Sequence, residues 1–217
     1  EGELARVKTL KRNQDKLYLP VCSPVEFDSH ETLLISPYLL GTLLGDGSLR
    51  AVTPTLSFGD QEIIKLVKRE LPQDVVMKIG VDNRSATLSC KHGRQTKSSL
   101  RKALETFGLN GSYSQTKHIP SAYLFASIPD RFALLQGLLD TDGGVELNVL
   151  GNGAVSYCTT STQLAESVAF IVRSLGGTAQ TRWRDCYAYN NGTRKQGLPA
   201  AIMRVRLPQE LGCPFRL

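Results

Sequence analysis

Residues 37–47 read PYLLGTLLGDG, a nearly all-apolar run that ends in an aspartate between two glycines. A second run, FALLQGLLDTDG at residues 132–143, ends in a similar way. When the runs are aligned on Asp46 and Asp142, both have leucine at positions −7 and −3, glycine at −5 and a small residue at −1. The chain therefore contains an internal repeat, and each copy predicts an apolar helix that closes on an aspartate.

The segments after the two copies also correspond. In each half the pattern predicts two strands, a helix and two further strands after the apolar helix, with a closing helix only in the first half. We expect an extended lead-in over residues 1–32, a first half over 33–117 and a second half over 118–217. The predicted elements are a strand near 55–58, a helix over 60–71, strands over 75–81 and 86–91 and a helix over 95–107, then strands over 145–149 and 154–160, a helix over 162–175 and strands over 177–189 and 200–207.

The two aspartates are unfavourably placed unless something compensates their charge. A carboxylate at the carboxyl end of a helix lies near the negative end of the helix dipole, which costs about 0.3–1 kcal/mol. In both copies small residues lie four positions apart on one face, as Gly41 and Gly45 do, and this spacing lets two helix backbones approach closely. Helices packed along these faces would bring Asp46 and Asp142 together, and a divalent cation such as Mg²⁺ would relieve their repulsion. The plainer alternative is two buried helices, each followed by an ordinary turn.

The charge distribution favours a polyanionic partner. The 217 residues include 26 Lys and Arg against 20 Asp and Glu, a net charge of +6, which ordinary enzymes also reach. Arginines flank Trp183 and Val205, which we interpret as core residues. Side chains alternate along a strand, so each arginine pair lies on one face, where it either contacts nucleic acid or forms a solvated surface. The candidate DNA contacts are Arg182, Arg184, Arg194, Lys195, Arg204 and Arg206 in the second half, and Arg50, Lys78, Arg84, Lys91 and Arg94 in the first.

Several classes of protein are excluded by composition. The apolar run over residues 33–45 is too short to span a bilayer, and residues 1–17 lack the apolar core of a signal peptide. The five cysteines are odd in number and show no C-x-x-C spacing, which favours a reducing compartment. The three histidines show no metal-ligand spacing. We expect an intracellular protein of the cytoplasm or nucleoid, without a membrane partner.

The repeated motif resembles that of the LAGLIDADG family of homing endonucleases, in the single-chain form with two motifs, over roughly residues 36–207. Residues 117–120, KHIP, resemble the block that precedes the second motif in the endonucleases of inteins, and residues 161–168, STQLAESV, resemble the block that follows it. The resemblance implies an α/β fold, a pseudo-two-fold pair of αββαββ units packed through the motif helices, with a saddle of antiparallel sheets in the DNA major groove. It also implies a site-specific double-strand DNA endonuclease, derived from an intein.

The resemblance further assigns roles to particular residues. It implies that Asp46 and Asp142 bind divalent metal, Mg²⁺ or also Mn²⁺, with the backbone carbonyls of Gly45 and Thr141 as further ligands. It gives Lys117 a catalytic role, for which the alternative is a surface lysine before a turn. It implies a monomer that acts on double-stranded DNA with a long target site.

Two departures and two rival functions remain. The second copy has Asp140 where the first has Leu44, so we expect Asp140 to be structural. A basic partner of Lys117 in the second half is not evident: Arg204 and Arg206 are candidates, and the alternative is a partner beyond Leu217. One rival is a nucleic-acid-binding module on the same fold that no longer cuts, such as a maturase or a transcription regulator, although both aspartates are present. The other is a basic α/β protein with a small-molecule site.

Overall fold

The computed structural model describes residues 22–29, 31–93, 95–147, 153–190 and 193–217. Within these residues, each motif forms a helix that leads directly into the first strand of an antiparallel sheet. None of the helices found there is long and apolar enough to cross a membrane.

The first half begins with the helix of the first motif, in which a proline occupies the first turn, where its missing N–H costs nothing. Its four strands form a sheet in the order β1-β2-β4-β3, and all neighbouring pairs are antiparallel. The elements are α2 (Pro37–Gly45), β1 (Gly47–Ser48), β2 (Thr55–Ser57), α3 (Gln61–Glu70), β3 (Val75–Ile79), β4 (Ser85–Cys90) and α4 (Ser99–Thr106).

The second half repeats this plan. Its sheet has the order β5-β6-β10-β7, which matches the first sheet strand for strand, and it adds a separate two-stranded hairpin. The elements are α5 (Ser121–Leu124), α6 (Ile128–Asp142), β5 (Gly143–Leu147), β6 (Gly153–Thr159), α7 (Thr162–Ser174), β7 (Thr178–Arg184), β8 (Tyr187–Asn190), β9 (Thr193–Gln196) and β10 (Ala200–Arg206), with 3-10 turns at Ser114–Thr116 and Gln209–Leu211.

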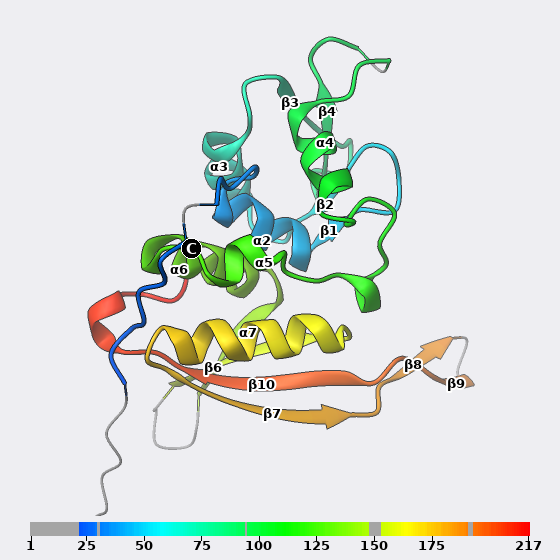
Figure 1. Cartoon of the computed structure of the whole chain (residues 1–217). Coiled ribbons are helices and arrows are strands. Elements are labelled where there is room, and N and C mark those ends of the chain that lie inside the picture. Colours follow the sequence, from blue (N-terminus) through cyan, green and yellow to red (C-terminus); the bar gives the residue numbers. More distant parts are fainter. Residues whose placement is uncertain (1–21, 30, 94, 148–152, 191–192) are drawn as a thin grey trace, which may run out of the picture.

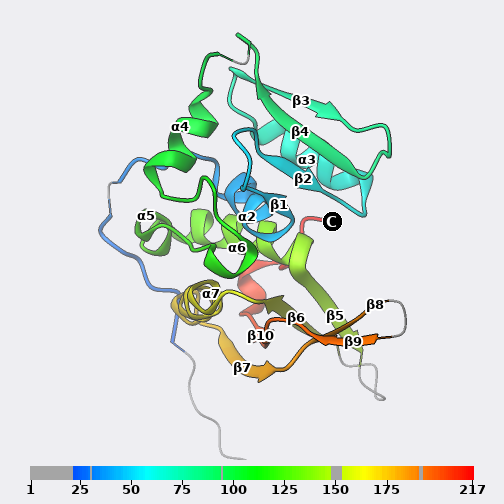
Figure 2. The same cartoon turned by 90° about the vertical axis from the view of Figure 1, so that its right-hand side faces the viewer.

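The two motif helices lie side by side in the middle of the molecule, with one half above them and the other below (Figure 1). Helix α7 covers one face of the second sheet. Seen from the side, α4, α5 and α7 lie to the left and much of both sheets to the right (Figure 2). The expected α/β fold, a pseudo-two-fold pair of αββαββ units joined through the motif helices, is confirmed.

Glycine makes the close approach of α2 and α6 possible. A Cβ atom on Gly41 would lie 2.3 Å from the carbonyl oxygen of Leu134, and one on Gly137 would lie 2.3 Å from that of Tyr38. Both contacts are far below van der Waals distance and involve rigid backbone of the opposite helix. The predicted packing of the motif helices along their small residues is therefore confirmed.

Two element predictions were wrong. The helix predicted over residues 95–107 begins only at Ser99, because the Ser98 hydroxyl caps it by accepting from the N–H of Arg101, and Asp74 accepts from both the N–H and the hydroxyl of Ser99. The strand predicted over residues 177–189 is two strands, β7 and β8, which belong to different sheets.

Residues 22–29 form neither helix nor strand, and they pack on the second half although they precede the first. The side chain of Arg131, at the start of α6, is fully buried and donates to the carbonyls of Val25 and Ala126 and to the Ser174 hydroxyl. Its guanidinium also lies 4.7 Å from the centre of the Phe27 ring. The segment is thus held by a buried, hydrogen-bonded cation.

A candidate metal centre and nucleic-acid interface

The two motif aspartates meet at the same end of the helix pair. Asp46 directly follows the last residue of α2, and Asp142 is the last residue of α6. A Cβ atom built on Gly45 would lie 3.4 Å from a carboxylate oxygen of Asp142. The tight packing of the helices therefore converts two distant positions in the sequence into one acidic pair.

Burial makes this pair costly to ionise. The pKa of Asp142 is raised to about 6, first by desolvation and then by the negative charge of Asp46, while the Lys117 ammonium opposes both effects. Desolvation also raises the pKa of Asp46 above its usual value, against the influence of Lys117. Two partly buried carboxylates that resist ionisation are stabilised by a nearby cation.

Lys117 is not the surface lysine of the plainer interpretation. Its side chain is only 5% exposed, and Nζ donates to the carbonyls of Gly45 at 2.8 Å and Gly47 at 2.7 Å and also contacts those of Leu43 and Leu44. The pKa of Lys117 is lowered to about 8, because the effect of burial outweighs the opposite effects of Asp142 and Asp46. The ammonium thus caps the carboxyl end of α2, where a cation is favoured, and lies beside both carboxylates.

The oxygen donors around the pair suit a hard divalent cation. The carbonyl of Gly45 already accepts from Lys117, so one lone pair remains for a metal. The hydroxyl of Thr141 donates to the carbonyls of Gly137 and Leu138 of its own helix, which leaves its backbone carbonyl as the expected ligand. Among the described residues no cluster of three or more His, Cys, Asp or Glu side chains suits a metal. Two carboxylates plus water and substrate oxygens are a donor set typical of Mg²⁺.

Tyr157 adds a polar group that the sequence did not suggest. This tyrosine on β6 lies directly opposite Gly143, its side chain is 1% exposed, and its hydroxyl has no hydrogen-bond partner among the described residues. Burial raises its pKa, and the charge of Asp142 raises it further, while Thr159 has a smaller opposite effect without completing a hydrogen bond. An unpartnered hydroxyl beside Asp142 is compatible with an additional polar ligand or water at this site.

Asp140 belongs to a different network. It accepts from the Tyr38 hydroxyl at 2.8 Å and from the backbone N–H of Arg216 at 3.1 Å. The guanidinium of Arg216 also donates to Glu70 on α3 at 3.1 Å. The contacts of Asp140 therefore join α6, α2 and the carboxyl-terminal residues, as its expected structural role requires.

The arginines of the second sheet occupy its uncovered face. Ala201, Met203 and Val205 on β10 are buried under α7. The β10 residues that alternate with these three, and the β7 residues paired with those alternating residues, therefore point to the opposite face of the sheet. A groove of about 310 Å³ lies on this sheet, between β5 and β7. The expected contact residues on this face are Arg182, Arg184, Arg204 and Arg206, all exposed.

The interpretation of Trp183 as a core residue was wrong. Its side chain points to the α7 face but is 49% exposed, because β7 is an edge strand and the tryptophan is covered from one side only. Arg204 is also not a partner of Lys117, because it lies on the uncovered face and pairs with Glu146 at 3.2 Å. Arg206, two residues further, is exposed on that same face.

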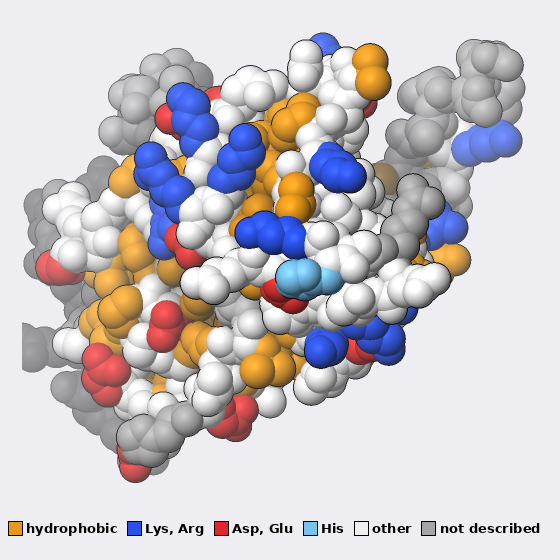
Figure 3. All heavy atoms as spheres, turned by 90° about the horizontal axis from the view of Figure 1, so that it is seen from above, with side chains coloured by type: hydrophobic (Ala, Val, Ile, Leu, Met, Phe, Trp, Pro, Cys, Tyr) orange, Lys and Arg blue, Asp and Glu red, His pale blue; other side chains and the backbone are white. Residues whose placement is uncertain are grey.

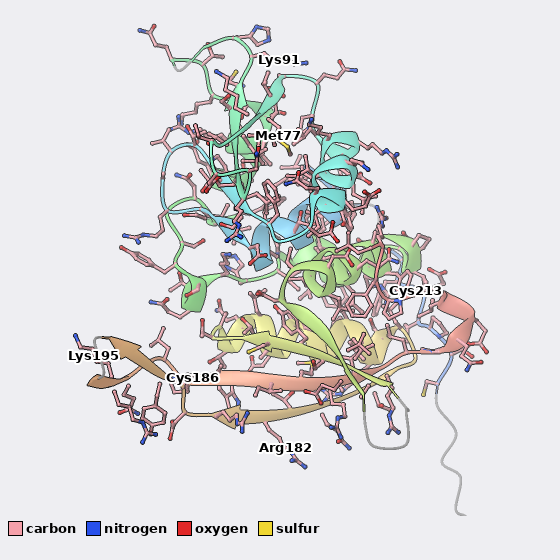
Figure 4. The ribbon with its side chains drawn as sticks, turned by 180° about the vertical axis from the view of Figure 1, so that it is seen from behind. Met77, Lys91, Arg182, Cys186, Lys195 and Cys213 are labelled. Atoms are coloured by element: carbon pink, nitrogen blue, oxygen red, sulfur yellow. The ribbon has the colours of Figure 1, made fainter. Side chains whose placement is uncertain are left out.

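Further basic residues of the second half lie on the β8–β9 hairpin. The guanidinium of Arg194 stacks 3.5 Å from the centre of the Tyr187 ring, and Lys195 is exposed. From behind, Lys195 lies on the hairpin at one side of the molecule, and Arg182 points away from its lower edge (Figure 4). The hairpin therefore extends the basic surface beyond the second sheet.

The basic residues expected in the first half are more scattered. Lys78 and Lys91 line a groove of about 660 Å³ over β3 and β4. Arg84 is exposed between β3 and β4, and Arg50 lies 4.5 Å from the centre of the Tyr113 ring. Arg94 lies outside the described residues. Seen from above, Lys and Arg side chains surround a strip of hydrophobic ones on the first half (Figure 3).

Comparisons with known proteins found a matching family model and a similar helicase. The family model of the LAGLIDADG-like domain matches residues 130–204. The replicative DNA helicase DnaB of Mycobacterium intracellulare is 36% identical over 148 residues, which are 68% of this chain and 20% of that protein. The chain thus spans about a fifth of the helicase.

Two solved structures of the homing endonuclease I-DmoI are also similar in fold. One describes mesophilic variants, with 15% identity, a TM-score of 0.48 and coverage of 82% of this chain and 91% of that one. The other is a complex with DNA and Mn, with 14% identity, a TM-score of 0.49 and coverage of 80% and 89%. Residues 130–204 therefore match the model of the LAGLIDADG-like domain, and the first half of the chain repeats the motif and the strand order of the second half.

Proposed function

We propose that this chain is a site-specific, metal-dependent double-strand DNA endonuclease, a homing endonuclease with two LAGLIDADG motifs. The proposal rests on one observation above all, the convergence of Asp46 and Asp142 at one end of the closely packed motif helices. It treats residues 33–117 and 118–217 as the two halves of one enzyme and residues 1–32 as a lead-in.

The residues of the site divide the work of phosphodiester hydrolysis. Asp46 and Asp142 would hold Mg²⁺ or Mn²⁺, with the carbonyls of Gly45 and Thr141 as further ligands. Bound divalent cations would activate water and stabilise charge on the phosphate and the leaving oxygen. Lys117 keeps the last turn of α2 in place through its carbonyl contacts and adds positive charge beside both carboxylates.

Recognition would fall to the basic residues of the two halves. Arginine side chains on a sheet face can read guanine in the major groove, which is wide enough for a β-ribbon. Lys78, Lys91, Arg50 and Arg84 would extend the contact to the first half, and Lys195 and Arg194 to the hairpin. One copy of the chain would bind a long, specific duplex site through these residues.

We propose that the chain is the endonuclease portion of an intein, acting on intracellular DNA in the cytoplasm or nucleoid. A match to only a fifth of a replicative helicase is what an inserted segment within a longer protein would produce. The blocks at residues 117–120 and 161–168 support the same origin.

A cleavage assay with the wild type and the Asp46→Asn and Asp142→Asn variants tests the proposal. The substrates are duplexes that tile uninterrupted genes for replicative helicases, with and without Mg²⁺. We expect Mg²⁺-dependent cutting at one place by the wild type and loss of cutting of at least one strand in each variant. Specific binding without cutting would favour the non-cleaving module, and the absence of any salt-dependent duplex binding would contradict both functions.

A further inference from the structure

The uncovered face of the second sheet carries an acidic side chain among its arginines. Ser156 on β6 lies opposite both Arg204 on β10 and Gly144 on β5. Glu146, two residues after Gly144, therefore points to the same face as Arg204, across the intervening strand. Glu146 and Arg204 both line the groove on this sheet.

Glu146 and Arg204 form an exposed ion pair. The Nη2 atom of Arg204 lies 3.2 Å from Oε2 of Glu146, and the two side chains are 56% and 51% exposed. Exposed pairs of this kind contribute little to folding stability. Folding stability therefore does not explain the position of Glu146. On a surface proposed to bind nucleic acid, a carboxylate also repels the phosphates.

The ion pair leaves most of the arginine free. A guanidinium has five N–H donors in a rigid fork, and one contact to Glu146 fixes its direction without using the others. An arginine that a carboxylate holds over the sheet face is less free to turn toward the phosphates of a bound duplex. In the major groove, arginine donates to guanine O6 and N7, and glutamate accepts from the N4 amine of cytosine.

We propose that Glu146 determines specificity by holding Arg204 for base reading, so that the two side chains together select a G·C base pair. The inference rests on the proposed binding of duplex DNA by this face. Arg204 donates to the guanine edge, and Glu146 accepts from cytosine while disfavouring a phosphate contact by Arg204. Base pairs that present no guanine acceptors to Arg204 leave its donors unsatisfied.

Enrichment of bound duplexes from a randomised pool tests this without a known target. The wild type is compared with Glu146→Gln and with the matched control Glu166→Gln, which makes the same charge change on the exposed side of α7. We expect the wild type to prefer G·C at one position by roughly 5- to 100-fold. Glu146→Gln should lose that preference alone and bind the unselected pool more tightly, whereas Glu166→Gln should match the wild type.

The possible outcomes separate this inference from the proposed function. If the wild type enriches no sequence, the proposed function fails. If it enriches a sequence and Glu146→Gln enriches the same one with equal strength, only the role of Glu146 is refuted. A uniform loss of preference at every position in Glu146→Gln would also refute it. Arg204→Ala should lose the same G·C preference and, unlike Glu146→Gln, bind the unselected pool more weakly.

Discussion

The ionised carboxylate of Asp142 lowers the stability of the folded protein. Its pKa of about 6 lies above the ordinary value of 3.8, because burial and Asp46 outweigh the attraction of Lys117. Between these two values the folded state binds a proton that the unfolded state does not. Stability from this group therefore falls as the pH rises from about 4 to 6 and stays lower above that window.

We expect Asp142→Asn to stabilise the metal-free protein at pH 7.5, by up to about 2 kcal/mol, because the buried charge is removed. The gain should shrink as the pH falls from about 6 to about 4, because the folded wild-type protein takes up a proton at this carboxyl in that window. Urea unfolding in EDTA at several pH values measures this. Asp74→Asn is the control, because hydrogen bonds from Ser99 lower the pKa of Asp74 and that variant should lose stability at neutral pH. Equal destabilisation by both changes at pH 7.5 would contradict the argument.

Two buried tyrosines offer a matched comparison. Both Tyr157 and Tyr123 are 1% exposed, but the Tyr123 hydroxyl donates to the carbonyl of Ile35 at 2.7 Å and accepts from its N–H at 2.9 Å. Tyr123→Phe should therefore cost about 1–3 kcal/mol, because it leaves buried partners unsatisfied. Tyr157→Phe should leave the stability of the metal-free protein unchanged or raise it. Thermal unfolding of the two variants measures the contrast, and a loss in Tyr157→Phe as large as in Tyr123→Phe would show that its hydroxyl is already bonded.

At the scale of elements, the helix pair depends on the absence of side chains at its crossing. A methyl group on Gly137 would meet the backbone of α2, which cannot move without separating the two halves. The same separation would pull Asp46 and Asp142 apart. Packing and the candidate metal centre are thus coupled through the same few glycines.

Gly137→Ala should therefore destabilise the protein by about 1–3 kcal/mol, the typical effect of overpacking, although alanine is a better helix former than glycine. Gly59→Ala is the control, since no atom lies within 4 Å of a Cβ built at that position. Urea unfolding of both variants gives the comparison. A Gly137→Ala variant as stable as the wild type would mean that the helices can move apart freely.

At the scale of the whole molecule, segments far apart in the chain hold the two halves together. Residues 22–29 attach to the second half through Arg131, and Arg216 near the carboxyl end contacts Glu70 on α3 and the ring of Tyr38 on α2. The basic surfaces of the halves lie far apart, with Lys91 near the top of the molecule and Lys195 on the hairpin (Figure 4). A duplex that contacts both must be long.

The proposed function predicts that Lys91 and Lys195 contact opposite ends of the target DNA. Lys91→Ala should shorten the protected stretch of target DNA at one end and Lys195→Ala at the other, because each lysine belongs to a different half. Each change should also reduce the slope of log affinity against log salt by about one, through the loss of one phosphate contact. Hydroxyl-radical footprinting and salt titration measure both effects, with Lys65→Ala on α3 as the control. Shortening at the same end in both variants would contradict the two-half arrangement.

The sequence alone determined the features that repeat locally along the chain. The two motif helices, their packing through glycine and the paired aspartates follow from residue spacing, because helix periodicity places those residues on one face. Tertiary structure alone decided the burial of Lys117 on the end of α2, the exposure of Trp183 at a sheet edge, the unpartnered hydroxyl of Tyr157 and the pairing of Glu146 with Arg204. Each depends on which distant segments meet and which surfaces stay uncovered, and hydrophobic periodicity carries no information about contacts between side chains so far apart in the chain.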